Sequence, residues 1–103
     1  MKELIERMKV VLADSFAFYL KAHYYHWNVE GINFPQYHAF FETIYSEVYD
    51  SVDVIAEHIR TLDAYAPGSF GRFKELSNIL DETSVRSEEH TSELQSRFGI
   101  SYA

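Results

Sequence analysis

The sequence predicts an all-α protein in which two long helices form an antiparallel hairpin and a short third helix follows. Three observations predict this fold class. Residues that break helices are scarce, with four glycines and two prolines among 103 residues. Apolar residues recur at steps of three and four along two long segments, which is the spacing of one helix face. The helix-breaking residues stand at the borders of these two segments, where a chain must turn.

The first helix is expected from Lys2 to about Glu30, a segment that contains neither glycine nor proline. Its apolar positions follow one another at helical spacing and predict a single buried face. They are Leu4, Ile5, Met8, Val11, Leu12, Phe16, Tyr19, Leu20, His23 and Trp27. A segment of this length is typical of a helical bundle.

The second helix is expected after a short connection that is marked by Gly31, Asn33 and Pro35. Apolar positions at helical spacing continue over residues 37–62. The pattern stops at Ala66-Pro67-Gly68, where proline removes a backbone donor and glycine allows a turn. Two long helices that are joined by a short loop are usually antiparallel neighbours, so the two segments predict a hairpin.

A short third helix is expected after the hairpin. Ser69 is a suitable N-cap residue, and apolar residues follow it at steps of three. These residues are Phe70, Phe73, Leu76 and Ile79. From about Val85 the sequence is rich in serine and glutamate and carries only a thin apolar stripe.

Composition and charge exclude several classes of protein. The chain is 47% apolar and 24% charged, as globular domains are, and without cysteine it can form no disulfide bond. Nine basic against sixteen acidic residues give a net charge of −7, which argues against nucleic-acid phosphates as the main ligand. The longest uncharged stretch, residues 31–41, is too short to span a bilayer, and the first ten residues do not resemble a signal peptide. We expect a soluble, cytoplasmic protein that has no membrane partner.

Both long helices carry apolar or aromatic residues over more than a narrow stripe. Phe16, Phe18 and Tyr19, for example, cover much of one helical turn. A hairpin of two helices cannot bury two surfaces of this width by itself. We therefore expect exposed apolar surface on the hairpin and association with other chains.

The residues most suited to chemistry are the histidines and carboxylates of the hairpin. His38 and Glu42 are four residues apart, as are Asp53 and Glu57, so each pair shares one helix face. Imidazole nitrogen and carboxylate oxygen together suit iron, zinc or manganese. Such a pair alone is more often a solvated helix face, so the spacing of the whole set must decide.

Helix geometry ties a metal site to dimerisation. His38 and Asp53 are fifteen residues apart, which is roughly 22 Å along one straight helix at the usual rise per residue. They cannot bind the same ion within one chain, whereas His26 lies at the same end of the hairpin as His38. If all these groups form one site, Asp53 and Glu57 must come from an antiparallel second copy. A two-fold axis would then generate two identical sites.

The ordinary di-iron site of helical bundles requires Glu-x-x-His pairs that face the bundle interior. The sequence contains no such pair, because Arg60 follows Glu57 at the third position and Tyr45 follows Glu42. This excludes the standard site and leaves a site between two chains.

Two segments resemble the Dps family, the ferritin-like DNA-binding proteins from starved cells. They are residues 21–38, K-A-H-Y-Y-H-W-N-V-E-G-I-N-F-P-Q-Y-H, and residues 53–57, D-V-I-A-E. The order is His-Trp-Asn, a histidine twelve residues later, an acid four beyond it, and then Asp-x-x-x-Glu. This is similar to the ferroxidase pattern of the family, and it falls on His26, His38, Glu42, Asp53 and Glu57.

The resemblance implies a role for each of these residues. His26 and His38 of one chain would bind iron together with Asp53 and Glu57 of its neighbour, and these four would be the catalytic set. Glu42 would be a further ligand or would lie directly behind one, and Trp27 would pack beside the iron.

For the whole molecule the resemblance implies a ferritin-like four-helix bundle subunit, and this chain would correspond to half of that bundle plus the short helix. Subunits of the family form two-fold dimers within a hollow dodecamer. They oxidise Fe(II) with peroxide or oxygen, store the ferric product, and so protect the cell against oxidative damage. Direct DNA binding is not expected of this chain, because its N-terminus is short and mixed in sign.

The resemblance covers residues 1–80, which we interpret as an incomplete ferritin-like region. The family continues into two further long helices, for which this chain has no room. We therefore expect a reading frame that is truncated after the second long helix. Residues 81–103 are expected to be an unrelated tail, because from about Arg86 the sequence resembles translated adapter or read-through sequence.

Other interpretations of the same residues stay open. The chain could be a non-catalytic helical module for oligomerisation or an inactive fragment, and its metal could be zinc or manganese instead of iron. His23 is expected to be structural or to lie behind the ligands, whereas His58 and His90 are expected at the surface. Tyr24, Tyr25, Tyr45 and Tyr49 are expected to fill core and interface.

Overall fold

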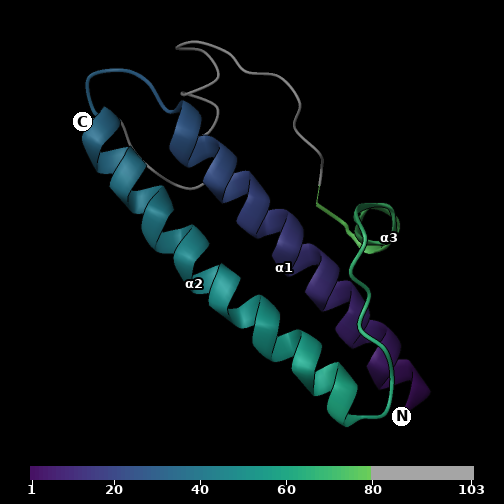
Figure 1. Cartoon of the computed structure of the whole chain (residues 1–103). Coiled ribbons are helices and arrows are strands. Elements are labelled where there is room, and N and C mark those ends of the chain that lie inside the picture. The colour runs from purple at the N-terminus through teal and green to yellow at the C-terminus, as the bar shows by residue number, and fades with distance from the viewer. Residues whose placement is uncertain (80–103) are drawn as a thin grey trace.

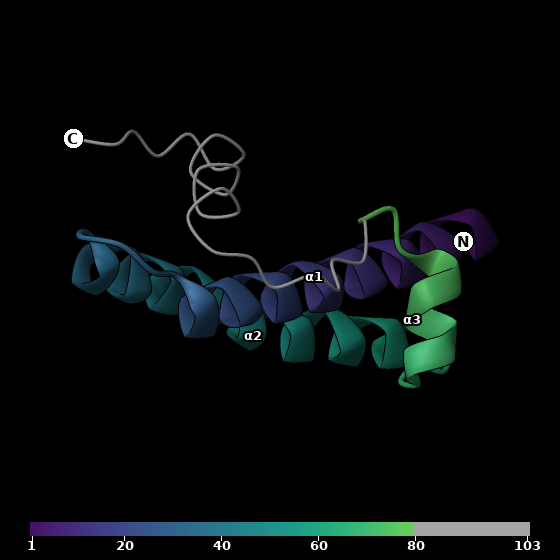
Figure 2. The ribbon, with the colours of Figure 1, turned by 90° about the horizontal axis from the view of Figure 1, so that it is seen from above.

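The computed structural model describes residues 1–79 as a hairpin of two long helices and a short third helix. Helix α1 comprises Lys2–Asn28, α2 comprises Phe34–Thr61 and α3 comprises Phe70–Leu76. The two long helices lie side by side and antiparallel (Figure 1), and α3 packs against α1 and across the hairpin (Figure 2). Over residues 1–79, the predicted all-α hairpin of two long helices with a short third helix is confirmed.

The connection between α1 and α2 is short because local geometry turns the chain at once. Val29 leaves the helix in an extended conformation, with φ −64° and ψ 137°, and its N–H still donates to the carbonyl of Tyr25. Gly31 adopts φ 112°, a left-handed value that favours glycine. Pro35 lies in the first turn of α2, where its missing N–H costs no helical hydrogen bond.

The best-packed part of the core lies at this closed end of the hairpin. A cluster of four buried residues joins the end of α1 to the start of α2, and it comprises Tyr25, Val29, Tyr37 and Phe41. Burying a side chain such as Phe41 contributes on the order of 1.5–3 kcal/mol. The cluster therefore holds the last turn of α1 against the first turns of α2.

Helix α2 ends earlier than the sequence predicts, at Thr61 and not at Ala66-Pro67-Gly68. The chain turns at Asp63, whose φ of 64° is left-handed, a conformation that aspartate tolerates better than most residues. The N–H of Ala64 then donates to the carbonyl of Ile59, and the Arg60 guanidinium donates to the carbonyl of Ala64. These bonds close the helix before the proline is reached.

Helix α3 begins as predicted, since the Ser69 hydroxyl accepts a hydrogen bond from the N–H of Arg72 at 3.2 Å. It ends at Leu76, however, and does not continue to Ile79. The carboxylate of Asp14 on α1 accepts hydrogen bonds from the Ser77 hydroxyl at 3.1 Å and the Asn78 N–H at 2.6 Å. The chain is thereby drawn out of the helix towards α1.

Large apolar side chains remain exposed on the hairpin, as the width of its apolar faces predicts. Among them are Val11, Leu20, Trp27, Phe40 and Val54, each between 41% and 59% exposed. No helix within residues 1–79 is long and apolar enough to cross a membrane.

Candidate functional site

The most distinctive polar feature of the described chain is the contact between His26 and His38. The two imidazoles stack with ring centroids 3.5 Å apart and an interplanar angle of 22°. The Nδ1 atom of His26 lies 2.6 Å from the carbonyl oxygen of His38, and the Nδ1 atom of His38 lies 2.7 Å from the carbonyl oxygen of His26. The two residues therefore hold each other through reciprocal hydrogen bonds.

These hydrogen bonds determine which nitrogen of each ring is available to a ligand. A carbonyl oxygen can only accept, so each Nδ1 must carry the hydrogen and donate it. In the neutral imidazole the lone pair then resides on Nε2, and neutral imidazole is the form that binds metals. The pair thus offers two nitrogen donors whose orientation is set by the backbone.

The sequence places both histidines next to core residues. Tyr25 precedes His26 and Tyr37 precedes His38, and both tyrosines are buried in the core at the closed end of the hairpin. The histidines are consequently brought to the neighbouring face, where His26 is only 7% exposed. The ring of Phe34 stacks on that of His38 at 4.8 Å and covers its other side.

The predicted carboxylates lie elsewhere on α2. Glu42, Asp53 and Glu57 are all exposed. Within residues 1–79 no three or more histidine, aspartate, glutamate or cysteine side chains come together in one chain as a metal site would require. The structure thus brings His26 and His38 together and leaves Asp53 and Glu57 further along the same helix.

Aromatic rings surround the histidine pair on the side away from the hairpin loop. The ring of Tyr45 lies 5.1 Å from His26 and stacks on His23 at 3.9 Å with an interplanar angle of 10°. His23 also contacts Trp27 at 4.1 Å, and its Nδ1 lies 3.2 Å from the Tyr19 hydroxyl. The four-residue spacing of His23 from both Tyr19 and Trp27 is the sequence signal of these contacts.

The pKa of His23 lies below its ordinary value of 6.5. The larger cause is desolvation, because partial burial disfavours the charged ring. The second cause is repulsion from a charge on His26. A neutral His23 can accept the Tyr19 hydroxyl proton in a hydrogen bond at Nδ1.

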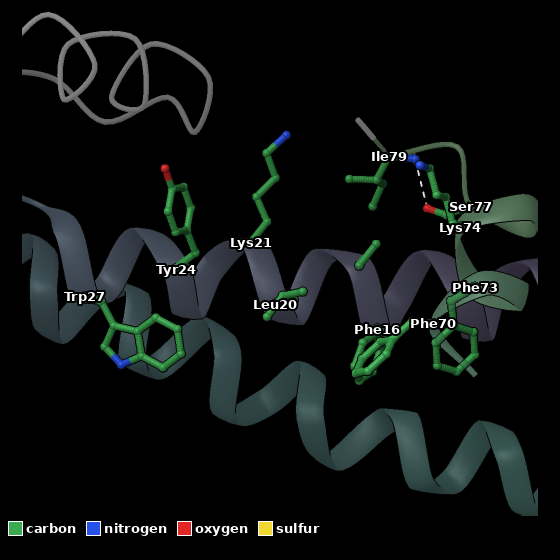
Figure 3. A pocket seen from close by; sticks show the side chains of 11 residues that line it. Phe16, Leu20, Lys21, Tyr24, Trp27, Phe70, Phe73, Lys74, Ser77 and Ile79 are labelled. Atoms are coloured by element: carbon green, nitrogen blue, oxygen red, sulfur yellow. Dashed lines mark hydrogen bonds between the residues drawn. The ribbon is translucent and has the colours of Figure 1, made fainter. Parts of the chain in front are cut away.

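A second feature of the described residues is an apolar groove of about 430 Å³ between α1 and α3. Phe16 and Phe73 stack at its α3 end, with ring centroids 4.9 Å apart, and Trp27 stands at the other end (Figure 3). Leu20 lies between them, and Ile79 and Lys74 also line the groove near its α3 end (Figure 3). The residues that line the groove include no histidine or carboxylate, so the histidine pair is the better candidate for a metal site.

Comparison with known proteins places this chain in a family. The ferritin-like domain family matches residues 5–97. Among the curated relatives, antigen TpF1 of Treponema pallidum (strain Nichols) is 39% identical over 80 residues, which is 78% of this chain and 45% of the relative. DNA protection during starvation protein 2 of Bacillus anthracis is 32% identical over 78 residues, or 76% of this chain and 53% of the relative.

Solved structures give the same result. The crystal structure of antigen TpF1 superposes with a TM-score of 0.80 at 32% identity, over 95% of this chain and 69% of that one. The Dps protein of Vibrio cholerae O1, described as a member of a broad superfamily of ferritin-like diiron-carboxylate proteins, matches with a TM-score of 0.80 at 31% identity. That match covers 95% of this chain and 62% of the Vibrio protein. The chain spans about half the length of the curated relatives it matches.

Proposed function

The chain belongs to the Dps family of ferritin-like proteins, and we propose that it is an iron-binding subunit that oxidises Fe(II) at a site shared between two chains. The observation that supports this proposal best is the histidine pair. His26 and His38 each donate from Nδ1 to a backbone carbonyl, and each is left with a lone pair on Nε2.

Two nitrogen donors alone do not complete an iron site, and oxygen donors must join them. Asp53 and Glu57 are exposed, and they share one face of α2 because they are four residues apart. A second copy whose α2 runs antiparallel would bring its own Asp53 and Glu57 to His38 of the first. The two-fold axis would repeat the site at the other end of the contact.

In this proposal Fe(II) is the substrate. Each residue has a simple role: the imidazoles bind the ion without adding charge, and the two carboxylates of the second copy offset its positive charge. Glu42 lies one turn beyond His38 and would either bind the ion or lie directly behind a residue that binds it. A site with an open position admits peroxide or oxygen, which removes electrons from the iron. The ferric product would be stored inside a closed shell of subunits, as in an iron-storage protein.

The proposed role in the cell is protection against oxidative damage, since oxidation of Fe(II) removes a reactant of peroxide. Relatives that are named for DNA protection during starvation support this role. The net charge of −7 favours protection through iron chemistry over direct contact with DNA.

The first test compares Fe(II) oxidation by the chain and by the double variant His38→Ala, Glu57→Ala. We expect the double variant to lose the acceleration of Fe(II) oxidation completely. A control variant removes an exposed histidine and an exposed glutamate elsewhere, His58→Ala with Glu75→Ala, and should retain it. Equal rates in the chain and in the double variant would exclude these ligands.

A second test decides whether the site is shared between chains. Chains with His38→Ala and chains with Glu57→Ala are unfolded, mixed in equal amounts and refolded together. Each variant alone should be inactive. Half of the refolded dimers contain one chain of each kind, and each of these mixed dimers has one intact site out of two, so about one quarter of the activity should return. A site within one chain predicts that no activity returns.

The exposed apolar surface also favours a second candidate function, a helical module whose only role is oligomerisation. The two functions differ in their response to metal. A ligand that binds only the folded assembly must raise its thermal stability. Fe(II), Zn(II) and Mn(II), added separately without oxygen, should therefore raise Tm under the iron-site proposal and identify the preferred metal, and they should leave Tm unchanged for the non-catalytic module.

A further inference from the structure

The ring of Phe34 lies against His38, one of the two imidazoles of the candidate site. The two rings stack with centroids 4.8 Å apart and an interplanar angle of 26°. The ring of His26 stands on the other side of His38, at 3.5 Å and 22°. The imidazole of His38 is therefore held between two rings. One belongs to its partner in the pair, and the other is a phenyl ring that cannot bind a metal.

Local structure places Phe34 for this contact. It is the first residue of α2, and its N–H donates to the carbonyl of Gly31 at 3.2 Å. Phe34 and His38 are four residues apart, so they share one face of the helix and are separated by one turn. Because the side chains of a helix lean towards its N-terminus, His38 leans towards Phe34.

Burial in the core does not account for the position of Phe34. Its side chain stays 37% exposed, whereas Tyr37 and Phe41 on the same helix are buried. Phe34 is also not among the residues that form or flank the core cluster at this end of the hairpin. Its ring packs instead on the imidazole of His38.

A single hydrogen bond leaves the imidazole of His38 one freedom that matters for a ligand. Its Nδ1 donates to the carbonyl of His26 at 2.7 Å, and this bond fixes one point of the ring. The ring could still tilt about the line from Nδ1 to the carbonyl oxygen, because the outer torsion of a histidine side chain is broad. Such a tilt would move Nε2 and turn its lone pair away from a metal ion. The two flanking rings oppose it.

We infer that Phe34 is a positioning residue of the proposed iron site, and that its ring holds the imidazole of His38 in the orientation that binds Fe(II). This inference rests on the proposed function. A ligand that is ordered before the ion arrives loses less conformational entropy on binding. The cost of ordering one side chain corresponds to roughly two- to tenfold in affinity. Loss of the Phe34 ring should therefore weaken Fe(II) binding by this factor.

The test compares Phe34→Leu, which removes the flat ring, with Phe34→Tyr, which keeps it, both in the full chain. The rate of Fe(II) oxidation is measured over a range of Fe(II) concentrations. In Phe34→Leu the concentration at half-maximal rate should rise by roughly two- to tenfold. The maximal rate should not change, because saturating Fe(II) itself orders His38. Phe34→Tyr should restore the half-saturating concentration of the unsubstituted chain.

The matched control for the loss of a ring is Phe40→Leu. Phe40 lies on the same helix with a similar exposure of 41%, and its ring contacts that of the core residue Phe41. This variant should keep the half-saturating Fe(II) concentration of the unsubstituted chain. A merely structural effect of either substitution would lower the amount of folded protein, and so the maximal rate, without changing the half-saturating concentration.

A second readout needs no metal. In the metal-free chain the carbonyl of His26 holds the Nδ1 hydrogen of His38, so nuclear magnetic resonance should detect this hydrogen as a slowly exchanging signal. Phe34→Leu should broaden or remove the signal, because the ring is then free to tilt. Phe34→Tyr and Phe40→Leu should both retain it.

The outcomes separate this inference from the proposed function. A half-saturating Fe(II) concentration that is unchanged in Phe34→Leu would overturn the positioning role and leave the iron site intact. The same conclusion would follow if Phe34→Tyr behaved like Phe34→Leu, since the flat ring would then not be the cause. If the unsubstituted chain does not accelerate Fe(II) oxidation at all, the proposed function fails and the positioning role fails with it.

Discussion

At the scale of single residues, His26 and His38 combine a structural and a chemical property. Each side chain donates a hydrogen bond to a backbone carbonyl of the other helix, and these bonds tie the last turn of α1 to the start of α2. The same hydrogen bonds leave Nε2 of both rings as the metal-binding atom. A substitution at either position therefore changes both stability and ligand binding, and the two effects must be measured separately.

His38→Ala is expected to lower the free energy of unfolding even without metal. The substitution removes the hydrogen bond that His38 Nδ1 donates to the carbonyl of His26, together with the stacking of the two rings. The carbonyl of residue 38 remains as the acceptor for His26, so the loss of one hydrogen bond should be about 0.5–1.5 kcal/mol. Urea unfolding of the metal-free chain measures this loss. The exposed His58→Ala should change the free energy by less than about 0.5 kcal/mol.

His23 predicts how stability depends on pH. Its pKa in the folded chain is lowered from 6.5, so below that pH the unfolded chain binds the proton more readily. Protonation of His23 therefore favours unfolding. The free energy of unfolding is highest above pH 6.5, and it decreases as the pH falls from 6.5 through the lowered pKa of the folded chain. Tm should drop between about pH 7.5 and about pH 5.5, and His23→Phe should reduce this drop. An unchanged pH dependence in the variant would contradict the assignment.

At the scale of elements, the two long helices and α3 are stabilised in different ways. Helices α1 and α2 are long and pack on each other along their length (Figure 1). Helix α3 has seven residues, too few to be stable alone. It depends on the Ser69 cap, on the contact of Phe73 with Phe16, and on the bonds that Asp14 accepts after its last turn.

Asp14→Ala is expected to release α3 from α1. The variant removes hydrogen bonds to the Ser77 hydroxyl and to the backbone and side chain of Asn78. Because these bonds end on a carboxylate, the loss should be about 1.5–3 kcal/mol for the local opening of α3. Hydrogen exchange of the α3 amides measures that opening, and the amides of α2 serve as the internal reference. Glu75→Ala, an exposed acidic residue within α3, should leave the exchange unchanged.

Ser69→Ala tests the other end of the same helix. It removes the acceptor for the Arg72 N–H and should cost about 1 kcal/mol, a typical loss for an N-cap. Faster exchange of the first α3 amides would report the loss. Asp14→Ala and Ser69→Ala both promote the local opening of α3. Because the two contacts share no residue, the free-energy losses that hydrogen exchange measures for the two variants should add in the double variant.

At the scale of the whole molecule, the hairpin leaves apolar surface for which it has no internal partner. Trp27 is 59% exposed and Leu20 is 46% exposed, and both line the apolar groove between α1 and α3 (Figure 3). Exposed apolar surface of this kind marks a contact with another chain. The proposed two-chain iron site likewise requires a contact with a second copy.

Self-association of the chain is therefore expected, and Trp27 reports it because it is the single tryptophan. Its fluorescence should shift to longer wavelength on dilution, as the indole returns to water. Leu20→Glu places a charge in the groove and should keep the emission at long wavelength at every concentration. Ile32→Glu changes an equally apolar residue in the loop, 87% exposed, and should have no effect. Emission that does not depend on concentration in the unsubstituted chain would contradict the expectation.

Much of the fold was predictable, because local sequence signals and the folded structure agree over most of the chain. The sequence predicted the helices and their topology correctly from three signals. These are the two long segments with helical periodicity, the glycine and proline residues that border them, and the Ser69 N-cap. The end of α2 was not predictable in the same way. It depends on a left-handed aspartate and on the hydrogen bond between Arg60 and Ala64, and neither has a strong sequence signature.

The candidate site, too, was predictable from the sequence only in part. The sequence by itself determined that His26 and His38 lie at one end of the hairpin and Asp53 and Glu57 at a distance, because helix rise depends only on residue number. Only the tertiary structure decided that the two imidazoles stack and bond to each other's backbone, and that His23 joins Tyr19 to Tyr45. Spacing along a helix is a local property, whereas ring contacts and the choice of imidazole nitrogen depend on how two helices pack against each other.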